Sequence, residues 1–287
     1  MTTRWSWGGL CTHSRVAVAT DAVLRGCSQV MFQNNPLTGL LFFIAIFVGA
    51  YEEGLPQVAF GCLLGTASAT LSAAWLVDDR TALRSGLYGY NGCLVGAALP
   101  TFLLPSAWLW IGVMFSSTIS VIVTVGLNRL LRTWKIAALT APFVLTTWTV
   151  LLASYPFSHL RHVRLPAAAI PADGAVFYAY PGVAEMLSGA LLAVVTSLAI
   201  GADPQAVFAG LYAFSAVLTA VALGSVFNPP GRRVLIYTLL GVIFTVLVQG
   251  AFNTLLAPLG MPSLTMPFVI ASWLFLSANP AVIAARR

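Results

Sequence analysis

The feature that most constrains this chain is a series of long apolar runs that carry almost no charge. Several of them approach or exceed the roughly 20 residues that a helix needs to cross a bilayer, namely residues 37–51, 57–77, 107–126, 136–153 and 234–255. Only 8% of the 287 residues are charged, whereas a soluble domain carries roughly a quarter. The sequence therefore predicts an all-α, polytopic membrane protein, with the lipid bilayer as its main solvent.

The positively charged residues indicate which loops of the chain are cytoplasmic. Its formal net charge of +6 comes from 14 Lys and Arg residues that are scattered over short loops and both tails, with no basic face. We therefore expect no nucleic-acid partner. Arg129, Arg132 and Lys135 follow the fourth apolar run, and cytoplasmic loops retain positive residues. This pattern predicts that the N-terminus and the 128–135 loop are cytoplasmic.

The chain contains an internal repeat. The segment 86–94, which begins Gly-Leu-Tyr, returns 124 residues later at 210–218. The segment 139–143, Leu-Thr-Ala-Pro-Phe, returns 125 residues later at 264–268 as Leu-Thr-Met-Pro-Phe, and a Trp follows each copy at 148 and 273. Two motifs at nearly one offset predict a tandem duplication. Five spans in the first half would make the two halves inverted repeats.

The two halves differ in length. We divide the chain into an N-terminal tail and first half (1–156), an external connector (157–181) and a second half (182–287). Gln29 precedes Gly86 by 57 residues, whereas Glu185 precedes Gly210 by only 25. The second half is therefore about 32 residues short, which is roughly one span with its connection. We expect nine spans, or ten if residues 175–188 enter the membrane.

Enzymatic and metal chemistry are not expected. The chain has no nucleotide-binding loop and no Ser/His/Asp set within its apolar runs, so we expect no enzyme and no cofactor. His159 and His162 lack a third ligand, which argues against a metal site. The four cysteines show no Cys-x-x-Cys spacing, and we expect them to act as small hydrophobic residues.

Three segments together resemble the bacterial urea transporter (urea channel) family. They are the stretch from Arg25 through Gln29, Phe32 and Pro36 to Gly39, the segment Gly86-Leu-Tyr-Gly-Tyr-Asn, and the repeated Leu-Thr-x-Pro-Phe motif. The resemblance extends over nearly all of residues 20–285. It implies a homotrimer of the inner (plasma) membrane, in which each subunit holds its own central pore between its two halves.

The resemblance also implies a set of residues that contact the solute. The first pore motif contributes Gln29 and Val30, and its second-half partner contributes Glu185 and Met186. Phe32, Tyr90 and Leu94 match one binding slot, and Phe214 and Leu218 match the other. Thr140 and Thr265 match the central site.

These residue types suit a planar, neutral and strongly hydrated solute. Flat aromatic walls exclude hydrated ions, while hydroxyl and carbonyl groups replace the hydrogen bonds that urea makes with water. Each Pro in the repeated motif lies inside an apolar span, so we expect it to remove an N–H and to free an upstream carbonyl as an acceptor. The same residues also fit packing against lipid, a Pro kink with Thr bonded to its own helix, and an ordinary interfacial Glu at 185.

The sequence thus predicts passive, facilitated diffusion of urea. Two alternatives stay open at this point. The pore could pass another small neutral solute, such as ammonia, water or a short amide. The shortened chain could also be a non-conducting scaffold or sensor that retains the fold.

Overall fold

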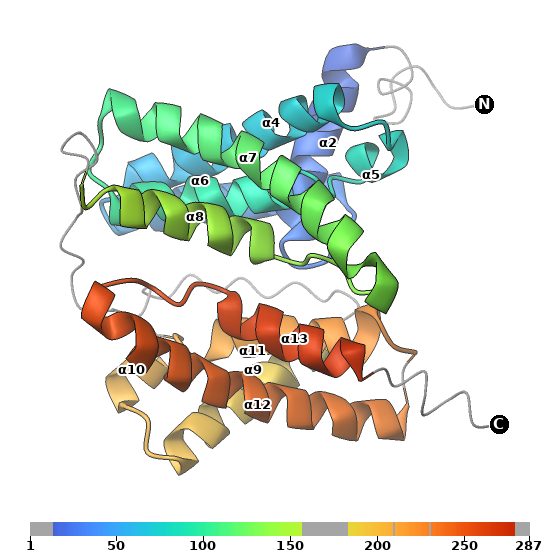
Figure 1. The fold of residues 1–287 in the computed structure, drawn as a ribbon, viewed down its shortest axis with the longest axis vertical. Coiled ribbons are helices and arrows are strands. Elements are labelled where there is room, and N and C mark those ends of the chain that lie inside the picture. Colours follow the sequence, from blue (N-terminus) through green and yellow to red (C-terminus); the bar gives the residue numbers. More distant parts are fainter. Residues whose placement is uncertain (1–13, 157–182, 209, 230, 279–287) are drawn as a thin grey trace. The chain divides into compact units, whose positions relative to one another are not determined.

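The computed structural model describes residues 14–156, 183–208, 210–229 and 231–278, and every regular element within them is helical (Figure 1). The predicted all-α class is confirmed. The expectations for the connector 157–181, including His159 and His162, lie outside the described residues, as do those for the N-terminal tail before Ser14.

The first two helices of the first half each have a side chain that caps the start of the helix. Ser14 accepts the Ala17 N–H at the start of α2, and Asn35 accepts the N–H groups of Leu37 and Thr38 at the start of α3. The elements of this half are α2 (Arg15–Gln29), α3 (Pro36–Glu52), α4 (Pro56–Leu76), α5 (Arg80–Arg84), α6 (Tyr90–Phe102), α7 (Ala107–Leu131), the short helix η1 (Arg132–Trp134) and α8 (Ala141–Ala153).

The described part of the second half repeats the later elements of the first in the same order. It contains α9 (Val183–Ala199), α10 (Pro204–Phe208), α11 (Ala213–Val221), the π-helical turn η2 (Ala222–Val226), α12 (Arg232–Leu256), η3 (Ala257–Leu259) and α13 (Met266–Ser277). Thus α10 corresponds to α5, α11 to α6, α12 to α7 and α13 to α8.

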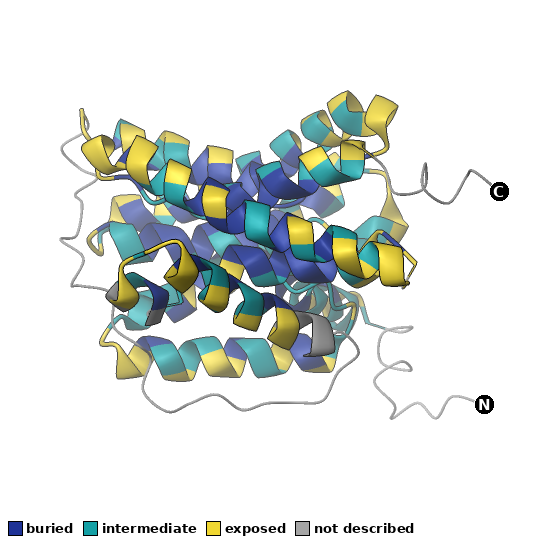
Figure 2. Ribbon diagram, turned by 90° about the horizontal axis from the view of Figure 1, so that it is seen from below, coloured by how far each residue is buried: buried dark blue, intermediate teal, exposed yellow. Residues whose placement is uncertain are grey.

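The helices have the lengths expected of a membrane protein. Among the described residues, Pro56–Leu76, Ala107–Trp134 and Arg232–Leu259 are long and apolar enough to cross a membrane. Shorter apolar helices span Pro36–Glu52, Ala141–Ala153, Leu187–Ala199, Ala213–Val226 and Met266–Ser277. Many of the helices keep one buried face and one exposed face (Figure 2). The exposed faces carry large apolar side chains, as helices in lipid do.

The duplication is present in the backbone as well as in the sequence. Three pairs of residues with positive φ recur at offsets of 124 or 125 residues: Gly86 and Gly210 (79° and 73°), Lys135 and Gly260 (56° and 59°), and Leu139 and Leu264 (52° and 51°). Because left-handed backbone is rare outside glycine, its recurrence at Leu139 and Leu264 shows that both halves build the same loop.

The register of the repeat identifies α9 as the counterpart of α4. A β-carbon placed on Gly65 of α4 would crowd Gly92 and Gly96 of α6, and one on Gly189 would crowd Ala220 and contact Ala216, each 124 residues further on. In this register Glu185 aligns with Gly61. The second half therefore resumes at the α4 position, and its described residues hold no counterpart of α2 or α3.

The chain forms two compact units whose boundary passes through α7 and α8. The first unit comprises Met1–Leu127 and Leu145–Arg164, and the second comprises Asn128–Val144 and Leu165–Arg287. The loop and first turn that carry the Leu-Thr-Ala-Pro-Phe motif therefore belong to the same unit as the second-half copy of that motif.

Candidate functional site

The two repeated threonines meet in the second unit. The Oγ1 atoms of Thr140 and Thr265 lie 2.7 Å apart, and each residue is only 3% exposed. The bonded hydroxyls come from corresponding positions 125 residues apart. The sequence predicts that these two residues share one site, and the structure brings them into direct contact.

The threonines stand at helix starts. Helix α8 begins at Ala141 and α13 at Met266, so Pro142 and Pro267 occupy the second position of a first turn. A first-turn N–H has no intrahelical partner, so Pro costs no hydrogen bond there. The expectation that each Pro lies inside a continuous helix and frees a carbonyl is therefore wrong. Each motif instead begins a new helix directly after its Thr.

The loops before the threonines are tied to neighbouring elements. In the first copy, Asn128 Oδ1 accepts the Ala138 N–H at 2.9 Å. In the second copy, Gln249 Nε2 donates to Asn253 Oδ1 at 2.9 Å and to Ser263 Oγ. These bonds hold the left-handed Leu139 and Leu264, a conformation that costs a non-glycine residue roughly 1–2 kcal/mol. The site is thus fixed by its surroundings.

The first pore motif lies at the end of α2. Gln29 ends that helix, and its Nε2 donates to the Ser85 carbonyl at 2.8 Å, directly before the left-handed Gly86. Val30 caps the helix and packs on a buried cluster around Cys27, while Phe32 is half-buried with a φ of 59°. In the first unit, Gln29 therefore joins the first pore motif to the Gly86 turn that precedes α6.

The slot residues of α6 and α11 occupy corresponding positions with different exposure. Tyr90 and Leu94 lie one turn apart at the start of α6, as do Phe214 and Leu218 at the start of α11, so each pair shares a helix face. Leu94 is half-buried, whereas Leu218 is 1% exposed and Phe214 is 46% exposed. Glu185 and Met186 lie in the first turn of α9, but their side chains are outside the described residues.

A further set of buried polar residues escaped the sequence analysis. Asn91 Nδ2 of α6 donates to Thr124 Oγ1 of α7 at 3.4 Å, and Thr219 and Thr245 share a hydrogen bond of 2.9 Å between α11 and α12. Three of these four positions are polar and buried in both halves, since Asn91 matches Ser215, Thr245 matches Ser120 and Thr124 matches Gln249; Thr147 and Ser272 are a further matched buried pair. Polar residues at the repeat offset inside apolar runs were the available signal.

Three cysteines gather in the first unit, where they are free and buried. The sulfurs of Cys27, Cys62 and Cys93 all lie within 4.8 Å of one another, and Cys62 and Cys93 are 3.2 Å apart. All three residues are buried, and they come from α2, α4 and α6. The cluster marks the point where these three helices cross.

Comparison with known proteins places the chain in a family. The sequence model of the urea transporter family matches residues 20–183 and 174–280, which together make up most of the chain. The chain belongs to the urea transporter family. It is similar to Urea transporter 1 of Ovis aries, with 27% identity over 305 residues that cover 91% of this chain and 78% of that protein. Urea transporter 1 of Rattus norvegicus is 26% identical over the same shares.

Membership of this family agrees with the helices and with the repeat. The chain is a multi-pass membrane protein, and its family is one of transporters rather than enzymes. The motifs that suggested the resemblance lie within the matched residues, including both copies of Leu-Thr-x-Pro-Phe.

Proposed function

We propose that this protein is a passive urea channel, through which urea crosses the inner (plasma) membrane by facilitated diffusion. Family membership and the similarity to two mammalian proteins named Urea transporter 1 support this function. The proposal includes a homotrimer with one pore in each subunit and a cytoplasmic N-terminus, as the positive residues of the 128–135 loop suggest.

The contact between Thr140 and Thr265 is the observation that carries the proposal. Each hydroxyl can both donate and accept a hydrogen bond, so the pair can separate and serve both the N–H groups and the carbonyl of a urea molecule. The Thr–Thr bond that is lost is then replaced by bonds to the solute. Because the site is buried, a solute that could not replace these bonds would pay the cost of unpaired polar groups.

The remaining residues have two kinds of role in this proposal. Tyr90 and Leu94, with Phe32, form one apolar slot, and Phe214 and Leu218 form the other. Gln29, Val30, Glu185 and Met186 line the approaches to the slots. Flat apolar walls offer no groups that could replace the water around an ion, while the threonine pair provides a polar binding site for a neutral solute.

The shorter second half is the feature that could have cost the protein its transport activity. The alignment with the Ovis aries protein spans 305 residues, more than the 287 of this chain, as expected if this chain lacks a segment that its relatives have. The elements that carry the threonines and the slots are nevertheless present in both halves. This favours a conducting channel over a scaffold or sensor.

Uptake of labelled urea into proteoliposomes tests the proposal. Replacing both threonines, Thr140→Val and Thr265→Val, should lower the uptake about tenfold. The polar groups of urea would then lack partners in the buried site, which costs about 1–3 kcal/mol. Thr149→Val is the matched control, because Thr149 lies exposed on α8 and donates to the Leu145 carbonyl of its own helix. It should leave the uptake unchanged.

The same assay separates the alternatives. No urea uptake by the folded parent protein would favour the scaffold or sensor. Urea uptake that is slow beside that of ammonia, water or a short amide would instead favour a channel for another solute. Equal uptake by the double variant and the parent would overturn the role of the threonine pair.

A further inference from the structure

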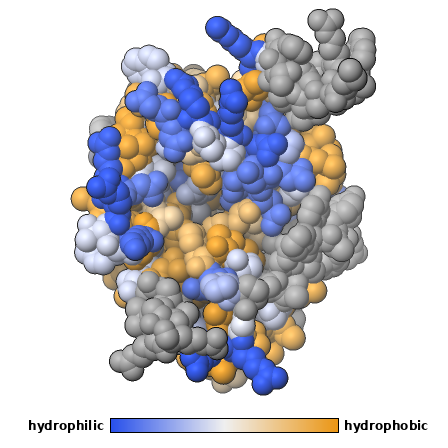
Figure 3. Space-filling view, turned by 90° about the vertical axis from the view of Figure 1, so that its right-hand side faces the viewer, coloured by the Kyte–Doolittle hydropathy of each residue, from blue (hydrophilic) through white to orange (hydrophobic). Residues whose placement is uncertain are grey.

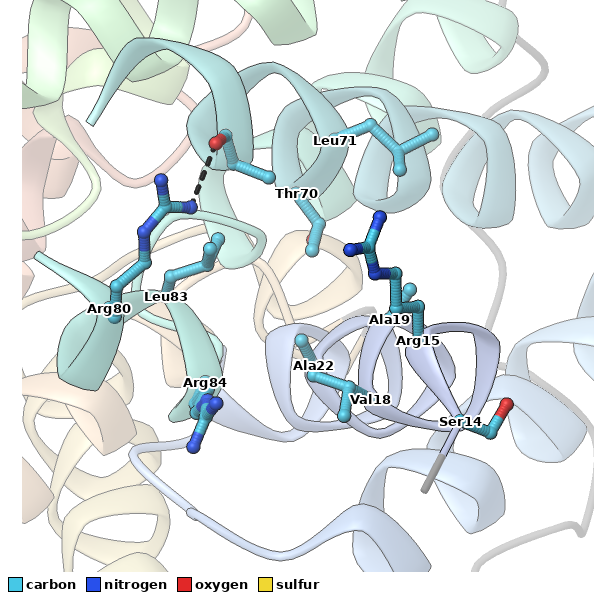
Figure 4. A pocket seen from close by; sticks show the side chains of 11 residues that line it. Ser14, Arg15, Val18, Ala19, Ala22, Thr70, Leu71, Arg80, Leu83 and Arg84 are labelled. Carbon is cyan, nitrogen blue, oxygen red and sulfur yellow. Dashed lines mark hydrogen bonds between the residues drawn. The ribbon is translucent and has the colours of Figure 1, made fainter. Parts of the chain in front are cut away.

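A cavity in the first unit is lined by none of the residues of the proposed solute pathway. It has a volume of about 620 Å³ and lies between α2, α4 and α5. Three arginines line it, Arg15 from the first turn of α2 and Arg80 and Arg84 from the two ends of α5 (Figure 4). Three cations from two helices thus border one space.

The positive charge of this cavity is not balanced by its lining. Within the described part of the chain, the lining residues include no carboxylate. Asp79 precedes Arg80, but its Oδ1 accepts the Ala82 N–H at 2.9 Å and caps α5, and Asp21 pairs with Arg25 at 2.6 Å. Arg80 donates to the Ala74 carbonyl at the end of α4. Three arginines around a lining that holds no described carboxylate favour binding of an anion.

The walls of the cavity are apolar, and they continue along the outside of α4. Val18, Ala22, Leu71 and Leu83 line the cavity. Leu71 is 61% exposed, and Trp75, one turn further along, is 86% exposed. Because α4 is a candidate membrane span that ends at Leu76, this end of the helix lies where a span meets water. Tryptophan is enriched at that depth.

The surroundings of the cavity have the polarity of a membrane boundary. Figure 3 looks onto the helix ends, on the side where α5 lies in Figure 1, and hydrophilic side chains gather in the upper part of this view. Arg80 and Arg84 belong to α5 on this side, while Leu71 and Trp75 are exposed apolar residues of α4. A ligand for this cavity needs an anionic head and an apolar tail.

We propose that this cavity binds an anionic phospholipid, with its phosphate between the guanidinium groups of Arg15, Arg80 and Arg84. Arginine binds phosphate oxygens through two parallel N–H bonds, and basic pockets beside membrane spans recognise anionic head groups. One acyl chain runs along Leu71 and Trp75. The apolar wall is what distinguishes a lipid from free phosphate as the occupant.

Native mass spectrometry of the full-length protein in detergent tests the proposal, with phosphatidylglycerol and phosphatidylcholine as the two probes. The parent should retain phosphatidylglycerol in preference. The triple variant Arg15→Gln, Arg80→Gln and Arg84→Gln should bind it about a hundredfold more weakly, since each basic residue near a membrane surface contributes about 1 kcal/mol. The corresponding Lys variant keeps the charge and should retain most of the preference.

The chain offers a matched control at the end of α7. Arg129, Arg132 and Lys135 are also three exposed cations, but they do not line this cavity. Replacing these three by Gln should leave lipid binding unchanged. An equal loss in both triple variants would overturn the site in favour of nonspecific charge, and a parent that binds both lipids equally would overturn it outright.

A second arm separates a lipid from free phosphate. Leu71→Ser should weaken phosphatidylglycerol binding while all three arginines remain in place. Millimolar inorganic phosphate should displace little lipid from the parent. Complete displacement by phosphate, together with no effect of Leu71→Ser, would identify a simple anion site and overturn the lipid assignment.

Discussion

The crossing of α4 with α6 and the crossing of α9 with α11 are two copies of one helix pair, built with different residues. In the first copy Gly61, Gly65, Gly92 and Gly96 face one another, and a β-carbon on Gly61 or Gly96 would fall on the carbonyl oxygen of the other. In the second copy Ala216 and Ala220 replace the glycines of α6, and Gly189 stands alone in α9 opposite them.

The difference shows how one fold tolerates two packing distances. Small residues spaced four apart let membrane helices approach until their backbones touch, and the first pair uses such spacing on both helices. The second pair keeps room for two methyl groups. The first half therefore depends more strongly on its glycines, and the cysteine cluster beside this crossing reflects the same close approach.

Exchanging the residues at one matched position is the strongest test of this difference. Gly96→Ala should lower the thermal unfolding midpoint and the yield of monodisperse protein in detergent, because the new methyl group meets the Gly61 backbone. We expect a cost at or above the upper end of the usual range for overpacking, about 1–3 kcal/mol. The backbone of Gly61 cannot move aside as a side chain can.

The reverse exchange in the second half is the control. Ala220→Gly removes a methyl group from a crossing that accommodates it, so we expect a loss of only about 1 kcal/mol, typical of Gly for Ala within a helix. Equal losses from the two exchanges would contradict the inference that the two crossings differ in tightness.

A second test uses the slot leucines, which occupy matched positions with unequal exposure. Leu94→Trp should fold, because Leu94 is half-buried, and should reduce urea uptake to the background of empty liposomes, because the indole fills the slot. Leu218 is 1% exposed, so Leu218→Trp should first destabilise the second unit by overpacking. The measurements are urea uptake and the yield of folded protein.

The results for Leu94→Trp and Leu218→Trp show whether each leucine lines the solute pathway. Normal urea uptake by folded Leu94→Trp would remove Leu94 from the pathway. A Leu218→Trp variant that folds as well as the parent would show that space lies open beside Leu218, and the two slots would then be more alike than the structure indicates.

The sequence predicted the repeat well because its motifs demand unusual local structure. Leu139 and Leu264 are held in left-handed loops, and Gly86 and Gly210 are required for turns, so both copies keep recognisable residues. The register of Glu185 was harder, since nothing in the sequence near it marks α9 as the counterpart of α4. The structure aligns it with Gly61, whereas its pairing with Gln29 rests on the family resemblance and stays a prediction.

Other features could not be read from one chain. The cysteine cluster depends on which helices cross, and the spacing of Cys27, Cys62 and Cys93 does not record that. The glycine crossing did leave a signal, because Gly61 and Gly65 are four residues apart, as are Gly92 and Gly96. The start of α8 at Ala141 was missed because an apolar run conceals a helix boundary.

The smallest expected effect concerns the loop that precedes each threonine motif. Lys135 has a φ of 56° after η1, and its counterpart Gly260 has a φ of 59° after η3. Lys135 is exposed, so its side chain contributes little packing. Left-handed backbone costs Lys roughly 1–2 kcal/mol, and the greater freedom of an unfolded Gly offsets about 0.5–1 kcal/mol of that.

Lys135→Gly should therefore raise the apparent unfolding midpoint slightly, with a gain of about 0.5–1 kcal/mol, and Gly260→Lys should lower it by a similar amount. Lys135→Ala separates backbone from charge, because it removes the ammonium group but keeps the β-carbon that makes the left-handed conformation costly. If Lys135→Ala stabilises the protein as much as Lys135→Gly, repulsion from Arg129 and Arg132 is the cause instead. A higher unfolding midpoint for Lys135→Gly and a lower one for Gly260→Lys, with no gain for Lys135→Ala, would show that both halves impose the same backbone conformation on different residues.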